Sequence, residues 1–209
     1  MSCPQPRNYA ADVTRTNYHH GALREALLTA TLALIESDGI GAVSLRRVAR
    51  AAGVSPGAPY HHFPDRAALL VALSDEGFRR LTVALTTAHD AAPGPTEALE
   101  AILNAYVRFA QDNPAYFRLM FRPELKQSRS PESDDAGEAA FTVLDTTVIE
   151  CLATNTMQPV DKDVLAITLW SLVHGLASLW LDGQLAHHTD NPAELARQVA
   201  ALVTQFTRA

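Results

Sequence analysis

Three arginines and a nearby aromatic run carry the side chains best suited to chemistry in this 209-residue chain. Arg46, Arg47 and Arg50 lie close together, and the run Tyr60-His61-His62 follows them. A guanidinium is a planar fork that matches both a phosphate and the edge of a guanine. Such a triplet alone is more often a solvated helix face. Beside a short helix that ends in the Tyr-His-His run, however, it predicts contact with DNA.

Two other patterns resemble catalytic or metal sites. The segment Gly53-Val-Ser-Pro-Gly57 fits G-x-S-x-G, but that hydrolase motif needs a preceding strand, and a helical stripe stands there instead. Histidine pairs occur at 19–20, 61–62 and 187–188. Adjacent helical residues point about 100° apart, so a pair does not chelate one ion. We therefore expect no enzyme, no metal and no cofactor, and keep a hydrolase as a minor alternative.

Charge is divided unevenly along the chain. The total of −6 argues against a nucleic-acid partner, but residues 1–66 hold seven arginines against five acidic residues, a net charge of +2. Residues 67–209 hold ten basic against eighteen acidic residues, a net charge of −8. Only the first part attracts phosphate. Two distant cysteines and no apolar stretch typical of a signal peptide predict a cytoplasmic protein.

The first part of the chain is predicted to form a tail followed by four helices. Residues 1–16 lack periodicity and are expected to form a flexible tail. A first helix begins at Tyr18 and ends at Gly39, and a second is capped by Ser44 and ends at Gly53. Ser55 is expected to cap a short third helix, and Asp65 begins a longer fourth one. The apolar faces of these helices are expected at Leu23, Leu27, Ala30 and Leu34, at Leu45, Val48, Ala49 and Ala52, and at Leu69, Leu70, Leu73, Phe78 and Leu81.

The second part contains only helical periodicity. Apolar-periodic segments cover roughly 96–111, 114–123, 136–154, 161–185 and 192–207, and the polar stretch 124–136 is expected to be a loop. No segment alternates as a half-buried strand does. The fold class is therefore all-α, with about nine helices.

The run from Ser44 to Leu70 resembles the DNA-binding domain of TetR-type transcriptional regulators. Its letters are SLRRVARAAGVSPGAPYHHFPDRAALL, and the upstream YHHGALR at 18–24 is similar to the first helix of many members. The resemblance implies a tail at 1–16, a helix-turn-helix domain at 17–70, and a C-terminal regulatory, ligand-binding and dimerisation domain at 71–209. The partner would be a double-stranded DNA operator.

The resemblance also implies a role for each residue of the motif. Ser44 would present a helix N-terminus to a phosphate, and Arg46 would reach a base edge. Phe63 is expected in the core instead. The full set of implied DNA contacts is Ser44, Arg46, Pro56, Gly57, Ala58, Tyr60, His61, His62 and Arg66.

The last two helices predict self-association. Residues 164–181 are apolar nearly all round but barely reach a membrane-spanning length and contain polar interruptions, so we expect a buried helix. Leucines at 165, 169, 172, 176 and 179 form a heptad-like seam, and Leu195, Val199, Leu202 and Phe206 repeat the spacing. Two such helices pair with their copies in a homodimer. The two helix-turn-helix domains of the dimer then bind a palindromic operator in successive major-groove faces about 34–36 Å apart.

The motif Trp170-x-x-x-His174-Gly175 resembles the Trp-His-Gly (WHG) signature of some TetR-type C-terminal domains. Family members sense a small molecule between the helices of that domain, which implies an effector here too. An aromatic-rich cavity suits an apolar or aromatic ligand. The candidate lining residues are Tyr106, Phe109, Tyr116, Phe117, Met120, Phe121, Phe141, Trp170 and His174. Most of these are also ordinary core residues, and His174 is more typical of a core histidine with one hydrogen bond.

These observations predict a ligand-responsive transcriptional regulator, a homodimeric repressor released from its operator by a small apolar or aromatic molecule. The alternative is a helical small-molecule binding protein without DNA binding.

Overall fold

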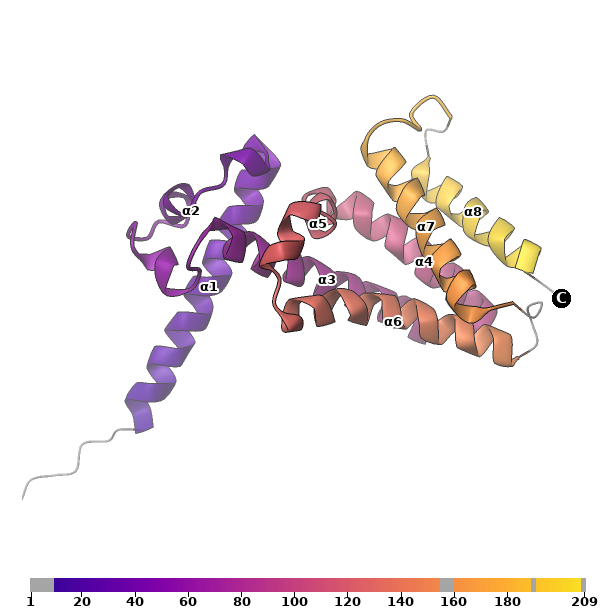
Figure 1. The fold of residues 1–209 in the computed structure, drawn as a ribbon, viewed down its shortest axis with the longest axis horizontal. Coiled ribbons are helices and arrows are strands. Elements are labelled where there is room, and N and C mark those ends of the chain that lie inside the picture. Colours follow the sequence, from indigo (N-terminus) through magenta and orange to yellow (C-terminus); the bar gives the residue numbers. More distant parts are fainter. Residues whose placement is uncertain (1–9, 155–159, 189–190, 208–209) are drawn as a thin grey trace, which may run out of the picture. The chain divides into compact units, whose positions relative to one another are not determined.

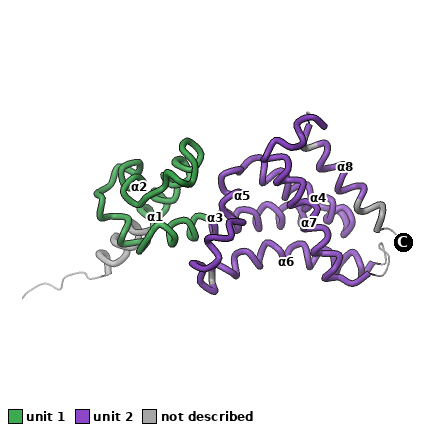
Figure 2. The backbone as a smooth tube through the Cα atoms, turned by 45° about the horizontal axis from the view of Figure 1, so that its top comes forward, with its two compact units in different colours: residues 1–73 green, residues 74–209 purple. Residues whose placement is uncertain are grey.

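The computed structural model describes residues 10–154, 160–188 and 191–207, and these ranges contain helices and connecting turns but no strand. The ribbon in Figure 1 follows the helices in chain order. The chain divides into two compact units, residues 1–73 and 74–209, which Figure 2 distinguishes by colour. The expected all-α class is confirmed.

The first unit is built from short helices around one long one. Its elements are α1 (Ala10–Asp38), the 3-10 helix η1 (Ile40–Ala42), α2 (Leu45–Ala51), the 3-10 helix η2 (Ala58–His61) and the start of α3 (Arg66–Asp90). Gly39 ends α1 with φ of 79°, a left-handed conformation that glycine adopts without steric cost. The buried side chains include Leu27, Val43, Leu45, Val48, Ala49, Phe63, Leu69, Leu70 and Leu73.

The second unit continues α3 and adds five α-helices and one 3-10 helix. These are α4 (Pro95–Asp112), α5 (Pro114–Met120), η3 (Pro123–Ser128), α6 (Pro131–Ala153), α7 (Lys162–Leu181) and α8 (Pro192–Thr207). Helix α4 is the centre of this unit because it packs against α5, α6, α7 and α8. Its buried face includes Leu99, Ile102, Leu103 and Tyr106.

Three element boundaries differ from the expectations. Helix α1 begins at Ala10, upstream of Tyr18, although the side chains of residues 10–20 lie outside the description. The stretch 124–136 is not a loop, because η3 covers Pro123–Ser128 and α6 begins at Pro131 with that proline in its first turn. The short third helix is the 3-10 helix η2, and no side chain caps it. The expected cap at Ser55 is therefore wrong.

Helix α7 is less buried than its composition predicts. Its buried stripe is Leu165, Ala166, Leu169, Val173 and Ala177, so the five leucines of the seam are divided: Leu165 and Leu169 are buried, and Leu172 and Leu179 lie at the surface. By length and composition alone α7 could cross a membrane, and 28% of its apolar window is buried. Core helices of soluble proteins meet the same criterion. Phe206 of the seam on α8 lies outside the described side chains.

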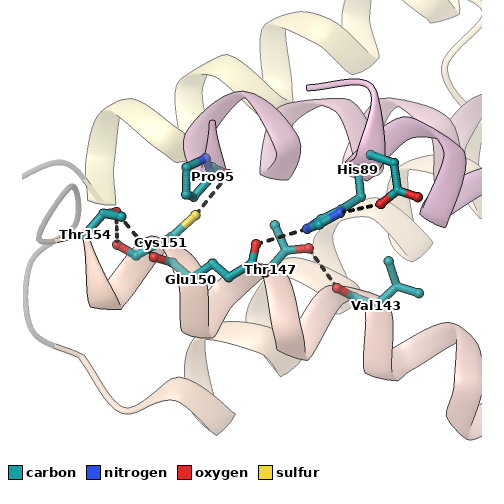
Figure 3. A network of polar contacts seen from close by, with 8 residues as sticks. His89, Pro95, Val143, Thr147, Glu150, Cys151 and Thr154 are labelled. Atoms are coloured by element: carbon teal, nitrogen blue, oxygen red, sulfur yellow. Dashed lines mark hydrogen bonds and ion pairs between the residues drawn. The ribbon is translucent and has the colours of Figure 1, made fainter. Parts of the chain in front are cut away.

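A polar cluster joins the end of α3 to α6 within the second unit. Figure 3 shows His89 between two carboxylates: Nδ1 is 3.1 Å from Asp90 and Nε2 is 3.0 Å from Glu150. These hydrogen bonds, that of Glu150 first, raise the pKa of His89 above its usual value. Next to Glu150, the Cys151 thiol donates to the carbonyl of Pro95 at 3.1 Å, and burial raises its pKa to about 11. That thiol is therefore a poor nucleophile near neutral pH.

Candidate nucleic-acid interface and effector cavity

Helix α2 begins at a well-formed N-cap. The Ser44 hydroxyl accepts a hydrogen bond of 3.3 Å from the backbone N–H of Arg47, and Ser44 itself is extended, with φ of −145°. Leu45, Val48 and Ala49 face the core. The cap fixes where the helix starts and hence which side chains point outward.

The outward face of α2 carries three arginines in two different states. The Arg47 guanidinium forms an ion pair with Asp38 of α1. Arg46 and Arg50 are exposed and have no ion-pair partner among the described residues. The positive charges free to meet a phosphate or base on this helix are therefore those of Arg46 and Arg50.

A tight turn separates α2 from η2. Gly53 has φ of 68°, and the N–H of Val54 donates to the carbonyl of Ala49 at 3.0 Å, which closes the end of the helix. Pro59 is buried, and its carbonyl accepts from the N–H of Phe63 at 2.9 Å. This anchoring leaves the other side of the segment exposed, at Pro56, Gly57, Tyr60 and His61, with Ala58 and His62 half-buried. The predicted contact residues of this segment thus share one region of the first unit.

Arg66 has partners that the sequence does not reveal. Its Nε donates to the carbonyl of Val43 at 2.9 Å, and a terminal nitrogen donates to the carbonyl of Ile40 at 2.7 Å. Both carbonyls belong to the short stretch between α1 and α2. The guanidinium that was predicted to bind a phosphate therefore also ties the start of α3 to the entrance of α2.

The second unit contains a cavity of about 670 Å³. That volume lies within the usual range of ligand pockets. The walls come from α3, α4, α6 and α7, from the end of α5, and from η3 with the residues on either side of it. Five of the predicted ligand residues line it: Tyr106, Met120, Phe121, Phe141 and Trp170.

The other four predicted ligand residues are not on the cavity wall. Phe109, Tyr116 and Phe117 are buried in the core, at 5%, 4% and 3% exposure. His174 meets Phe121 edge to face at 4.4 Å between ring centroids, and its Nδ1 is 2.9 Å from the Tyr106 hydroxyl. Burial lowers the pKa of His174 and raises that of Tyr106, so both side chains are neutral near pH 7.

Sequence reasoning missed the charged part of the cavity wall. Lys126 and Arg129 lie within the expected loop at 124–136, and Arg122 lies just before it. Asp134 and Glu138 come from α6. Further missed wall residues are aliphatic, including Leu81, Leu85, Ile102, Leu103, Leu144, Ile167 and Val173. The clustering of cations between positions 122 and 129 was visible in the sequence, but only the fold assigns it to a cavity.

Two family models match the chain, one in each unit. The model described as bacterial regulatory proteins, tetR family, matches residues 27–73. The model described as tetracyclin repressor-like, C-terminal domain, matches residues 99–203 and includes Trp170 and His174. The resemblance to the WHG subtype stays a prediction.

Similar proteins include solved structures and curated relatives. A protein of unknown function from Rhodococcus sp. RHA1 is 33% identical with a TM-score of 0.82, covering 92% of this chain and 98% of that one. The nucleoid occlusion factor SlmA of Glaesserella parasuis is 34% identical over 128 residues, and the transcriptional repressor KstR of Mycolicibacterium smegmatis is 33% identical over 99 residues. The matches cover 56% and 47% of this chain, and 62% and 48% of the two relatives. The chain belongs to the TetR family of bacterial regulatory proteins.

Proposed function

We propose that this protein is a cytoplasmic transcriptional regulator that binds operator DNA through its first unit. The single observation that carries this proposal is the outward face of α2, where Arg46 and Arg50 are exposed and without ion-pair partners among the described residues. The segment of η2 lies next along the chain, and its exposed Tyr60 and His61 suit contact with the DNA backbone. Arg46 reads a base edge, and the small residues Gly57 and Ala58 allow close approach to the groove floor.

Binding to the DNA upstream of the protein's own gene, measured across a salt series, tests this proposal. Affinity should fall linearly with salt on logarithmic axes, because each neutralised phosphate releases counterions. Absent binding, or binding that salt does not weaken, would favour the alternative of a helical small-molecule binding protein. The exposed arginines of α2 argue against that alternative.

We infer that the protein acts as a homodimer through α7 and α8. Single-chain packing leaves large apolar side chains of these helices at the surface: Val164, Ile167, Leu172, Leu179 and Leu202. Apolar surface of this kind is covered in stable soluble proteins, and a second copy of the same pair of helices supplies a self-complementary cover. A dimer also presents two DNA-binding units to a palindromic operator.

We infer that the cavity of the second unit binds the effector and that the protein is a repressor. The wall of the cavity is mostly aliphatic and aromatic, which suits an apolar or aromatic molecule. Helix α3 runs from Arg66, at the entrance of α2, to the wall residues Phe78, Leu81 and Leu85, so one helix belongs to both sites. A ligand that prefers one position of this helix shifts the population away from the DNA-binding state. Release of operator DNA by added effector, followed by fluorescence anisotropy, is the test.

A further inference from the structure

We propose that the effector is an amphipathic carboxylate, whose acid group binds Arg129 and whose apolar body fills the aromatic and aliphatic part of the cavity. This inference rests on the proposed effector role of the cavity and names the chemical class of the ligand. It is carried by the hydrogen bonds of Arg129, by the open position at Gly137 and by the exposure of the nearby acids.

Arg129 is a fixed cation on the cavity wall. One terminal nitrogen donates to the Ser74 hydroxyl at 3.0 Å and to the carbonyl of Met120 at 2.7 Å. The guanidinium also lies over the ring of Phe78, 5.1 Å from its centroid. These contacts hold the group in place but are made to neutral partners, and Arg129 has no ion pair with a described carboxylate. Among the described residues nothing neutralises this charge, and a ligand can use it together with the other guanidinium N–H groups.

Gly137 keeps the approach to Arg129 open. It lines the cavity from α6, and a Cβ atom at this position would lie 3.7 Å from Phe78 and 3.9 Å from the second terminal nitrogen of Arg129. Those are ordinary contact distances, so a small side chain would fit, and a longer one would cover both groups. The absence of a side chain at 137 thus exposes a cation beside an aromatic ring, which is the arrangement that an acid attached to an apolar body requires.

The other charged groups of the wall are less suited to bind a ligand. Arg122 is paired with Glu124 at 3.1 Å. Asp134 and Glu138 are exposed to water, so their charges are hydrated and screened, whereas Arg129 is half-buried. Lys126 is exposed and adds a second positive charge on the same side of the cavity. A cationic ligand held by Asp134 and Glu138 is the competing possibility, and the experiment distinguishes the two.

Three probes with one tail and different head groups test the proposal: dodecanoate, dodecan-1-ol and dodecyltrimethylammonium, the two ions kept below their micellar concentrations and the alcohol below its solubility limit. Binding to the full-length protein is measured by calorimetry and by the change in tryptophan fluorescence, to which Trp170 on the cavity wall contributes. Dodecanoate should bind about tenfold or more tightly than the alcohol, since a charge-assisted bond to a half-buried guanidinium is gained. The proposal is overturned if the alcohol binds equally well, if the ammonium probe binds most tightly, or if no probe binds.

Matched variants assign the preference to Arg129. Arg129→Gln should remove the preference for dodecanoate over dodecanol and leave the affinity for dodecanol within about threefold of the wild type, because the apolar wall is retained. Arg122→Gln removes a cation that is already paired and should keep the preference. Persistence of the preference in Arg129→Gln overturns the assignment.

A second pair of variants leaves the contacts of Arg129 intact and serves if Arg129→Gln does not fold. Gly137→Leu should weaken dodecanoate about tenfold, and Ala139→Leu, at an exposed position of the same helix, should not. Equal effects of the two substitutions would contradict the proposal. Operator binding of each variant without probe is measured in parallel. If the wild type binds operator DNA but shows no head-group preference, the proposed ligand class is wrong and the proposed function stands. If the wild type does not bind operator DNA, the proposed function itself is wrong.

Discussion

The side chain of Arg66 donates a hydrogen bond of 2.9 Å to the backbone carbonyl of Val43. Val43 directly precedes Ser44, the N-cap of α2, and a second bond from Arg66 reaches the carbonyl of Ile40 at 2.7 Å. The first residue of α3 therefore fixes the path by which the chain enters the arginine-bearing helix.

Arg66→Gln should weaken operator binding and leave its salt dependence almost unchanged. The substitution removes a guanidinium that positions α2, and a positioning defect does not alter the number of neutralised phosphates. Anisotropy titrations over a salt series measure both quantities. A slope that drops by about one unit would instead establish the phosphate contact that the family resemblance implies.

Arg46→Ala should cost about 1–3 kcal/mol of binding free energy on the cognate operator and much less on unrelated DNA, because a base contact discriminates between sequences. Arg47→Ala is the matched control, since the Arg47 guanidinium is engaged by Asp38. Exposed pairs of this kind contribute about 0–1 kcal/mol to stability. Equal losses of binding free energy on both DNAs would indicate that Arg46 contacts a phosphate and not a base.

The stabilising effect of His89 should decline as pH rises. The hydrogen bonds to Glu150 and Asp90 raise the folded-state pKa of His89, so the protonated form stabilises the fold. That contribution is fully present below the unfolded value of about 6.5 and is lost as pH rises through the higher folded pKa. The melting temperature of the wild type should exceed that of His89→Gln most clearly near pH 6 and least near pH 9.

The exposed His187 provides the control for this measurement. His187→Gln should leave the pH dependence of the melting temperature as it is in the wild type. If the gap between wild type and His89→Gln stayed constant across the pH range, the effect would be one of packing and not of charge.

Leu179→Glu should make the protein monomeric at micromolar concentration if the proposed dimer forms through α7 and α8. The Leu179 side chain is 48% exposed in the single chain, so the monomer's fold tolerates a charge there, whereas a buried dimer interface does not. Sedimentation velocity gives the oligomeric state. Operator affinity should fall in parallel, because two linked DNA-binding units bind more tightly than one. Val83→Glu, at an apolar residue of α3 that is 65% exposed, should remain dimeric. A dimeric Leu179→Glu protein would place the interface elsewhere.

Helix α2 and its boundaries are the part of the helix-turn-helix that local signals predict best, whereas the second helix of the motif is the uncapped 3-10 helix η2. Ser44 caps α2 through its own hydroxyl, and Gly39 and Gly53 end helices by adopting positive φ, so each boundary is decided within a few residues. The role of Arg66 escapes the same reasoning. Its partner carbonyls lie more than twenty positions upstream and carry no side-chain signature.

The cavity of the second unit is harder to predict because distant segments build it. Arg129 reads as part of a polar stretch, and its place on the wall depends on a bond to Ser74, 55 residues away in sequence. Helix α7 presents a different difficulty. Apolar residues of several kinds surround it, so their spacing does not say which side faces the core, and Val173 is buried where Leu172 is not.

Gly137 has an evolutionary consequence. Its backbone is helical and does not require glycine, and alanine is more favourable than glycine inside a helix by roughly 0.5–1 kcal/mol. A Cβ atom here meets Phe78 and Arg129 at ordinary contact distances, so selection for folding gives no reason to prefer glycine over alanine. If the cavity holds the effector as proposed, single-codon changes here would narrow the range of ligands step by step, and this position would offer related regulators a short mutational route to new effectors.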